Sequence, residues 1–292
     1  MVSLSRQLAQ WAVGLSYDDL PAAVVDRAKG VTLHSLASVM LGSQSKAGQQ
    51  AIQLITAEES GVTQGATIMV DGTTVTKGGA AFVNAEMAMS GGKLDSFRML
   101  THPGTSILPG AFVAAETAGA SGKEFLTGIA VGYEVMERLA SDFIPTVMSR
   151  GFHAGPVFGI FGPAMAAAKI FNLTEDQVNS TIALCVHLAA GNLEGPRSGG
   201  VALREGAAVR NAMLAVALAQ MGQEGGETTL EGEAGFYHAY TGNNKGRLTY
   251  SFVGDTQTSL DKITTGLGQD WMFLETLYRI YSTAGYNIAH VD

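Results

Sequence analysis

Cysteine and charge are both scarce in this sequence of 292 residues. Its single cysteine, Cys185, has no partner for an internal disulfide, which is typical of a protein from a reducing compartment. We expect Cys185 to be a small core residue. Charged residues make up 15% of the chain, and 18 Lys and Arg stand against 26 Asp and Glu, for a net charge of −8. Because the basic residues form no cluster, nucleic acid is not an expected partner.

Long apolar runs and the common metal and nucleotide motifs are absent as well. No stretch of about 18 uninterrupted apolar residues occurs, so the sequence predicts no membrane-spanning helix. Residues 1–21 resemble an amphipathic helix more than a signal peptide, and we expect a cytoplasmic protein. The HExxH, CxxC, GxSxG and P-loop patterns are missing, as is a GxGxxG between a strand and a helix. We therefore expect no metal or nucleotide site.

Apolar residues, in contrast, are abundant and make up 46% of the chain. A chain of this length and composition can bury a sizeable core. The few charges leave much of the surface apolar, which suggests that a second copy of the chain covers part of it as a homodimer. No repeat and no low-complexity linker divides the sequence, so residues 1–292 are predicted to form a single domain.

The apolar residues recur mostly at helical spacing, so the predicted fold class is all-α. Pro21 is placed to start a helix that Gly42 ends, and Thr174 with Gln177 forms a capping-box pattern before another. The segment 206–221 is apolar on nearly every face and predicts a central buried helix. Further helices are predicted over residues 47–59, 80–90, 107–119, 124–140, 157–171 and 175–190.

One segment breaks the helical pattern. Residues 66–79, ATIMVDGTTVTKGG, hold β-branched residues on both sides of Asp71-Gly72. Asp-Gly between such runs is a strong signal for a two-residue hairpin turn. The sequence therefore predicts an all-α domain that carries a small β-hairpin near residues 66–78.

Two of the six histidines stand at Gly/Pro-rich entrances to apolar segments. His102 lies in THPGTSILPG, and His153 lies in GFHAGPVFG. A residue before proline is pushed away from helical geometry, so His102 is expected in a loop that leads into a helix. Loops anchored on rigid helices often carry reactive groups, and histidine exchanges protons near neutral pH, as acid–base catalysis requires. The alternative is that each is an ordinary loop histidine.

Several longer segments resemble the MmgE/PrpD family, to which 2-methylcitrate dehydratase, cis-aconitate decarboxylase and iminodisuccinate epimerase belong. The resemblance spans nearly the whole chain and rests on segments such as VNAEMAMSGGKLDSF, THPGTSILPGAFVAAE, GFHAGPVFGIFGPAMAAAKIFNL and GLGQDWMFLETLYRIY. It implies a large helical domain, a smaller inserted lid domain, a homodimer without metal or organic cofactor, and an active site between the two domains. The implied chemistry is proton transfer beside a carboxylate-bearing carbon of a small molecule.

The resemblance also implies roles for particular residues. His102 matches the histidine of the family's THP motif and His153 that of its second loop, so both are predicted to be catalytic. Asp95 matches the second aspartate of an Asp-Asp-Thr segment, and Ser96 stands where the threonine usually is. We predict that Asp95 and Ser96 bind the substrate.

Other positions depart from the family pattern. Gly92 and Val201 stand where an aspartate and a lysine are usual, and Ala284 replaces a cysteine or histidine. Arg204 aligns with a histidine, and Arg279 aligns with a lysine. Arginine stays charged but can hold a carboxylate through two hydrogen bonds, so Arg204 and Arg279 are predicted to bind substrate.

Three functions fit these observations. The first is a family-type lyase with a remodelled site, acting without a cofactor. The second is a repurposed isomerase or cyclase for a larger, less charged biosynthetic intermediate, because Gly92, Val201 and Ala284 make a pocket roomier and less polar. The third is an inactive scaffold homologue. The sequence ends near the point where the family's lid would begin, so we expect the lid to be absent.

Overall fold

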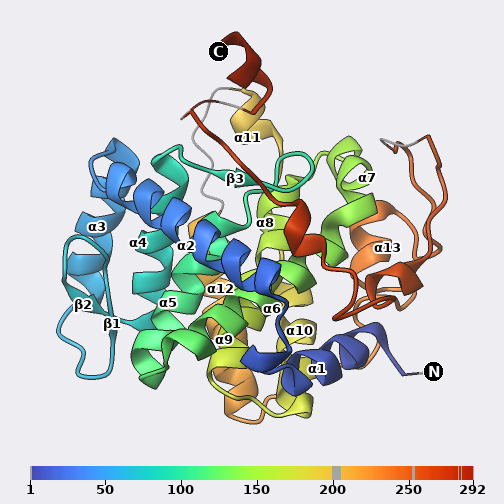
Figure 1. The fold of residues 1–292 in the computed structure, drawn as a ribbon, viewed down its shortest axis with the longest axis horizontal. Helices are drawn as coiled ribbons and strands as arrows, with labels where there is room; N and C mark the ends of the chain where they lie inside the picture. Colours follow the sequence, from blue (N-terminus) through green and yellow to red (C-terminus); the bar gives the residue numbers. More distant parts are fainter. Residues whose placement is uncertain (1, 199–204, 252–253, 282, 284, 292) are drawn as a thin grey trace.

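The structure, a computed structural model, describes residues 2–198, 205–251, 254–281, 283 and 285–291. It is a helical bundle (Figure 1), which confirms the predicted all-α class. Among the described residues, no helix combines the length and apolarity needed to cross a membrane. The α-helices are α1 (Leu4–Gly14), α2 (Ala22–Gly42), α3 (Lys46–Glu59), α4 (Lys77–Ser90), α5 (Gly104–Ala118), α6 (Gly122–Ala140), α7 (Ile144–Ser149), α8 (Ala154–Gly159), α9 (Phe161–Ile170), α10 (Glu175–Leu188), α11 (Glu194–Arg197), α12 (Glu205–Gln220) and α13 (Phe236–Thr241).

The core is centred on α6 and α9. Every residue of α6 from Thr127 to Ala140 is buried, and so is every residue of α9 except Lys169. The two helices cross closely: a Cβ added to Gly132 would lie 2.7 Å from the carbonyl oxygen of Gly162. A larger side chain there would push the helices apart, so glycine is what permits this packing.

The single helix predicted over 157–171 is wrong, because α8 ends at Gly159 and α9 begins at Phe161. Pro163 explains the interruption, since proline has no N–H to bond the carbonyl of Gly159 one turn earlier. The break leaves α8 as a short separate helix, and His153 is the residue that caps its start.

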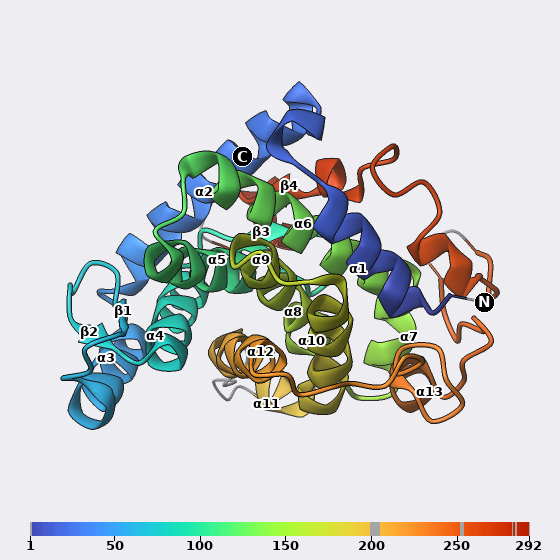
Figure 2. The same cartoon turned by 90° about the horizontal axis from the view of Figure 1, so that it is seen from below.

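The prediction that α12 is buried on all sides is also wrong. Its inner face packs against α4 and α10, and α12 lies at the edge of the bundle (Figure 2). Its outer face leaves Arg210, Leu214 and Ala217 exposed to solvent. Small alanines on that face made the helix look uniformly apolar in the sequence.

The predicted hairpin is confirmed, but its turn is longer than two residues. Strand β1 (Ala66–Thr67) pairs antiparallel with β2 (Thr74–Val75). The last backbone bond before the turn joins the N–H of Ile68 to the carbonyl of Thr73, 2.9 Å apart. Val70 and Gly72 both take positive φ angles, so the chain uses a wider loop than an Asp-Gly turn needs.

A second pair of strands was not predicted. Strand β3 (Asp95–Ser96) pairs antiparallel with β4 (Leu277–Tyr278), far away in the sequence. The pairing continues to Arg279, whose N–H lies 3.0 Å from the carbonyl oxygen of Leu94. In Figure 1, this segment runs beside β3 at one end of the bundle. It brings the last part of the described chain to the loop that holds His102.

Two buried charged residues on α6 form hydrogen bonds to residues 263–273, the segment that leads into β4. The guanidinium of Arg138 donates to the main-chain carbonyls of Ile263, Thr265, Gly266 and Asp270, and its Nε lies 2.5 Å from Glu134. The other carboxylate oxygen of Glu134 accepts the N–H of Phe273 at 3.0 Å. A charged pair in the core thus fixes an otherwise irregular segment, because it satisfies carbonyls that have no secondary structure to bond.

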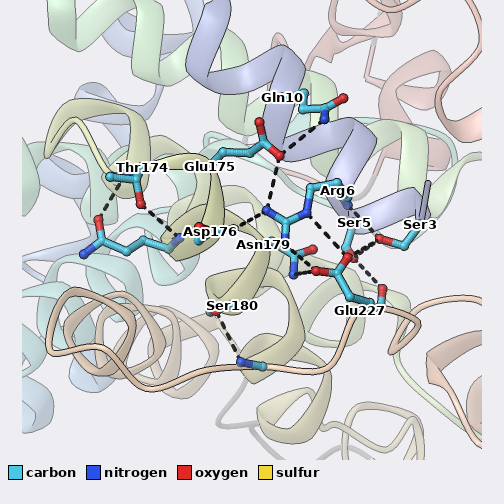
Figure 3. Close-up of polar contacts among 12 residues, drawn as sticks. Ser3, Ser5, Arg6, Gln10, Thr174, Glu175, Asp176, Asn179, Ser180 and Glu227 are labelled. Carbon is cyan, nitrogen blue, oxygen red and sulfur yellow. Dashed lines mark hydrogen bonds and ion pairs between the residues drawn. The ribbon is translucent and has the colours of Figure 1, made fainter.

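At the opposite end of the chain, Arg6 fastens α1 to the bundle (Figure 3). Its guanidinium lies 3.2 Å from Glu175 and 2.6 Å from Asp176, and it also pairs with Glu227. Beside this cluster, Thr174 and Gln177 form the capping box that the sequence predicted at the start of α10.

Candidate active site

His102 is held by the main chain of β3. Its ring Nδ1 lies 2.8 Å from the carbonyl oxygen of Asp95 and 3.3 Å from Oγ of Ser96. A carbonyl oxygen only accepts hydrogen bonds, so Nδ1 must carry the proton. In the neutral ring, Nε2 then keeps its lone pair, and this is the arrangement that a general base needs.

The lone pair of His102 faces Arg279. Nη2 of the guanidinium lies 3.2 Å from Nε2 of the ring, and the pairing of β3 with β4 puts it there. A permanently charged donor on Nε2 favours the neutral imidazole over the imidazolium. The same guanidinium suits a carboxylate, which could take the place of the ring as its partner.

Asp95 is buried behind this pair, with 1% of its surface exposed. Its two carboxylate oxygens lie 3.0 and 2.9 Å from the N–H of Gly104, and the Tyr133 hydroxyl donates to one of them at 2.6 Å. Burial raises the pKa of the Asp95 carboxyl, while the bonds from Tyr133 and Gly104 and the charge of His34 act to lower it. Asp95 thus ties β3 to the first turn of α5, with His102 between them.

His153 sits at the start of α8 with 1% of its surface exposed. Its Nδ1 accepts the N–H of Gly155 at 3.0 Å, so Nδ1 carries no proton. The neutral ring therefore carries its proton on Nε2. His102 and His153 are therefore held in opposite tautomers. Nε2 of His102 carries a lone pair, whereas Nε2 of His153 carries a proton.

The sequence analysis missed two buried carboxylates beside the start of α12, and one of them, Glu205, lies near His153. A Cβ added to Gly155 would lie 2.9 Å from Oε1 of Glu205 and 3.0 Å from Nδ1 of His153, so these two groups flank the same point. Glu205 is 3% exposed, and Glu86, 9% exposed, accepts the N–H of Gly206 at 3.1 Å. The sequence did contain a sign of these two sites, because Glu86 and Glu205 are each a single acidic residue in an apolar helical segment.

The structure brings Asp95, Ser96, His102 and Arg279 together. His153 comes from a different element, and α8 packs mainly against α12 and α6. Only the last residue of α8 approaches the first turn of α5, since a Cβ added to Gly159 would lie 3.6 Å from Oγ of Ser106. His153 is about 9 Å from Gly159 along the α8 axis. Arg204, Val201 and Ala284 lie outside the described residues.

Within the described ranges, no three His, Cys, Asp or Glu side chains are grouped as metal ligands would be. Cys185 is fully buried in α10, as predicted, and burial raises the pKa of its thiol. It is therefore held as a neutral thiol, which is a poor nucleophile.

Comparison with known proteins agrees with this architecture. The model of the MmgE/PrpD N-terminal domain matches residues 6–249. A cis-aconitate decarboxylase-like protein of Aspergillus oryzae is 27% identical over 97% of this chain, and the match covers 59% of that protein. Cis-aconitate decarboxylases of Aspergillus terreus and Homo sapiens are 25% and 27% identical, over 97% and 92% of the chain and 57% and 58% of their own lengths. The chain therefore spans less than two thirds of these relatives, and it belongs to the MmgE/PrpD family.

Proposed function

We propose that this chain carries the acid–base site of a lyase acting on a small carboxylate, with His102 as the base and His153 as the acid. The observation that carries the proposal is the pair of opposite tautomers. His102 presents an unprotonated Nε2 beside Arg279, and His153 is held with its proton on Nε2. One group is ready to take a proton and the other is ready to give one.

The proposed reaction begins when a substrate carboxylate draws Arg279 away from the ring of His102. In a dehydration, His102 Nε2 takes a proton from the carbon next to that carboxylate. The electron pair of the broken C–H bond forms a double bond as hydroxide leaves, and the Nε2–H of His153 supplies the proton that makes it water. The proton taken up by His102 is then released to solvent, and solvent returns a proton to His153. In a decarboxylation, the bond to the departing carbon dioxide supplies the electron pair, and a histidine returns a proton to carbon.

Asp95 has a positioning role in this proposal. Both of its carboxylate oxygens are taken by Gly104 and Tyr133, and its carbonyl holds the ring of His102. Substrate binding therefore falls to Arg279 and, where its hydroxyl is free to turn, Ser96. Arg204 is retained as a proposed substrate ligand on the family resemblance alone.

The relatives' names suggest cis-aconitate as a compound to test, and the family resemblance adds 2-methylcitrate and iminodisuccinate. Isotope exchange can separate the roles of the two histidines. The chain is incubated in D2O with cis-aconitate, 2-methylcitrate or iminodisuccinate, and product and carbon-bound deuterium are followed by NMR. We expect turnover of one of them. His102→Gln should reduce both exchange and product at least about 100-fold, whereas His153→Gln should reduce product formation while exchange continues.

The exposed His187→Gln serves as the matched control and should behave as wild type. Equal activity in wild type and both site variants would overturn the assignment of the histidines. No turnover and no exchange with any of the three compounds would overturn the lyase and favour the isomerase, cyclase or scaffold alternatives.

A further inference from the structure

The outer face of α2 carries an open pocket of about 690 Å³ that the proposed chemistry does not use. The outward-facing residues of α2 between Asp26 and Ala37 form one side of it, and Lys93 and Tyr278 form the other. Neither His102 nor His153 lines this pocket. It is large enough for a small organic molecule.

Positive charge is concentrated in this pocket, although the whole chain has a net charge of −8. Arg27, Lys29 and Lys93 line it, against one acid, Asp26. Nζ of Lys93 lies 2.7 Å from the carbonyl oxygen of Ile280, and Arg27 donates to the carbonyl of Thr276. Among the described residues, no ion pair neutralises any of these three cations. Main-chain carbonyls therefore orient two of the charges without cancelling them.

The rest of the lining is aromatic and apolar. The rings of His34 and Tyr278 are 5.1 Å apart, and the guanidinium of Arg27 lies 5.5 Å from the centre of the Tyr278 ring. Leu33 is 72% exposed beside them. A wall of this kind suits a ligand with a planar or apolar body, while the cations suit a compact group with more than one negative charge.

The pocket shares a wall with the candidate active site. Tyr278 pairs with Asp95 across the β3–β4 sheet, and the next residue, Arg279, contacts His102. His34 lines the pocket, and a positive charge on its ring would lower the pKa of the Asp95 carboxyl. A ligand here would touch the strand that carries Arg279, although neither His102 nor His153 lines the pocket.

We propose that this pocket binds a small organic anion, one that carries a multiply charged phosphate or polycarboxylate group on an apolar or planar body. The proposal does not depend on the lyase activity, because binding is measured directly. Inorganic phosphate, AMP and citrate are titrated separately into the intact chain by calorimetry, so that the phosphate and carboxylate sources are distinguished.

We expect AMP to bind more tightly than inorganic phosphate or citrate, which lack a planar body, and added salt to weaken binding. Lys29→Ala, on the exposed face of α2, should raise the Kd about fivefold to tenfold. Lys245→Ala removes an exposed lysine outside the pocket and should leave the Kd unchanged. No binding of any probe up to about 10 mM, or the same Kd in Lys29→Ala as in wild type, would overturn the proposal.

Discussion

His102 and His153 look alike in the sequence, since each stands just before a Gly/Pro-rich helix start, but the main chain treats them differently. One ring meets a carbonyl oxygen that needs a donor, and the other meets an N–H that needs an acceptor. Local sequence could place both histidines in loops before helices. It could not reveal which nitrogen each ring protonates, because that depends on the backbone atoms brought against it by folding.

Gly155 offers a residue-scale test of how tightly the His153 region is built. An alanine in a helix normally stabilises by up to about 1 kcal/mol relative to glycine. Here the new Cβ would lie 2.9 Å from Glu205 and 3.0 Å from the ring of His153. We expect Gly155→Ala to lower the free energy of unfolding by about 1–2 kcal/mol, measured by urea denaturation.

Gly122→Ala is the matched control, because a Cβ at the start of α6 would meet nothing within 4 Å. It should be neutral or slightly stabilising. If Gly155→Ala proves as stable as Gly122→Ala, the close approach of Glu205 and His153 to Gly155 is contradicted.

At the scale of elements, Glu137 lies fully buried on α6 and joins the segment before β4. Its Oε1 accepts the hydroxyl of Thr276 at 2.5 Å, while Oε2 has no hydrogen-bond partner in the described part of the chain. Burial raises the pKa of the Glu137 carboxyl well above its usual value, despite the bond from Thr276, and Glu134 and Asp95 raise it further. The folded protein therefore favours the neutral acid.

This burial predicts a pH dependence. The stability that the neutral acid contributes is fully present below the unfolded pKa of about 4.3 and is lost as the pH rises towards the raised folded pKa. Glu137→Gln keeps the shape but cannot ionise. Its free energy of unfolding relative to wild type should therefore increase from pH 5 to pH 8, by at least about 1.4 kcal/mol.

Chemical denaturation at several pH values measures this difference. The exposed Glu58→Gln is the control and should show a flat profile. A flat profile for Glu137→Gln as well would show that the carboxyl is not held neutral. The test is how the stability difference between Glu137→Gln and wild type changes with pH. It holds even if the glutamine itself lowers the stability at every pH.

Helical periodicity predicted most elements of the bundle, because apolar spacing and caps such as Thr174 act locally. Three features escaped it for physical reasons. Pro163 interrupts a helix because it lacks one N–H. The outer face of α12 is exposed but rich in alanine, so its sequence resembles that of a buried face. Strand β3 pairs with β4, which lies some 180 residues further along the chain. The contact of Arg279 with His102 depends on that last pairing, so spacing alone could not have found it.

At the scale of the whole molecule, the outer face of α12 carries large apolar side chains that are exposed to solvent. Leu214 is 48% exposed and Met221 85% exposed, and Phe171 lines a pocket of about 380 Å³ on the same face. Exposed apolar side chains grouped in this way are typical of protein interfaces. We propose that this face takes part in the homodimer expected from the scarce charge.

Light scattering after size exclusion tests the dimer. Wild type should elute at twice the chain mass of 30.4 kDa, and the double variant Leu214→Glu, Met221→Glu should elute as a monomer. Leu54→Glu places the same charge on α3, where the side chain is 50% exposed, and should leave the dimer intact. A wild-type monomer at micromolar concentration would contradict the proposal.

The protonation of the two histidines is the claim on which the proposed catalysis depends, and NMR can observe it without a substrate. Long-range ¹H–¹⁵N correlation of the histidine-labelled chain near pH 8, assigned with His102→Gln and His153→Gln, reports which ring nitrogen carries the proton. We predict a proton on Nδ1 of His102 and on Nε2 of His153. The same tautomer in both rings, or the two reversed, would contradict the assignment of one as base and the other as acid.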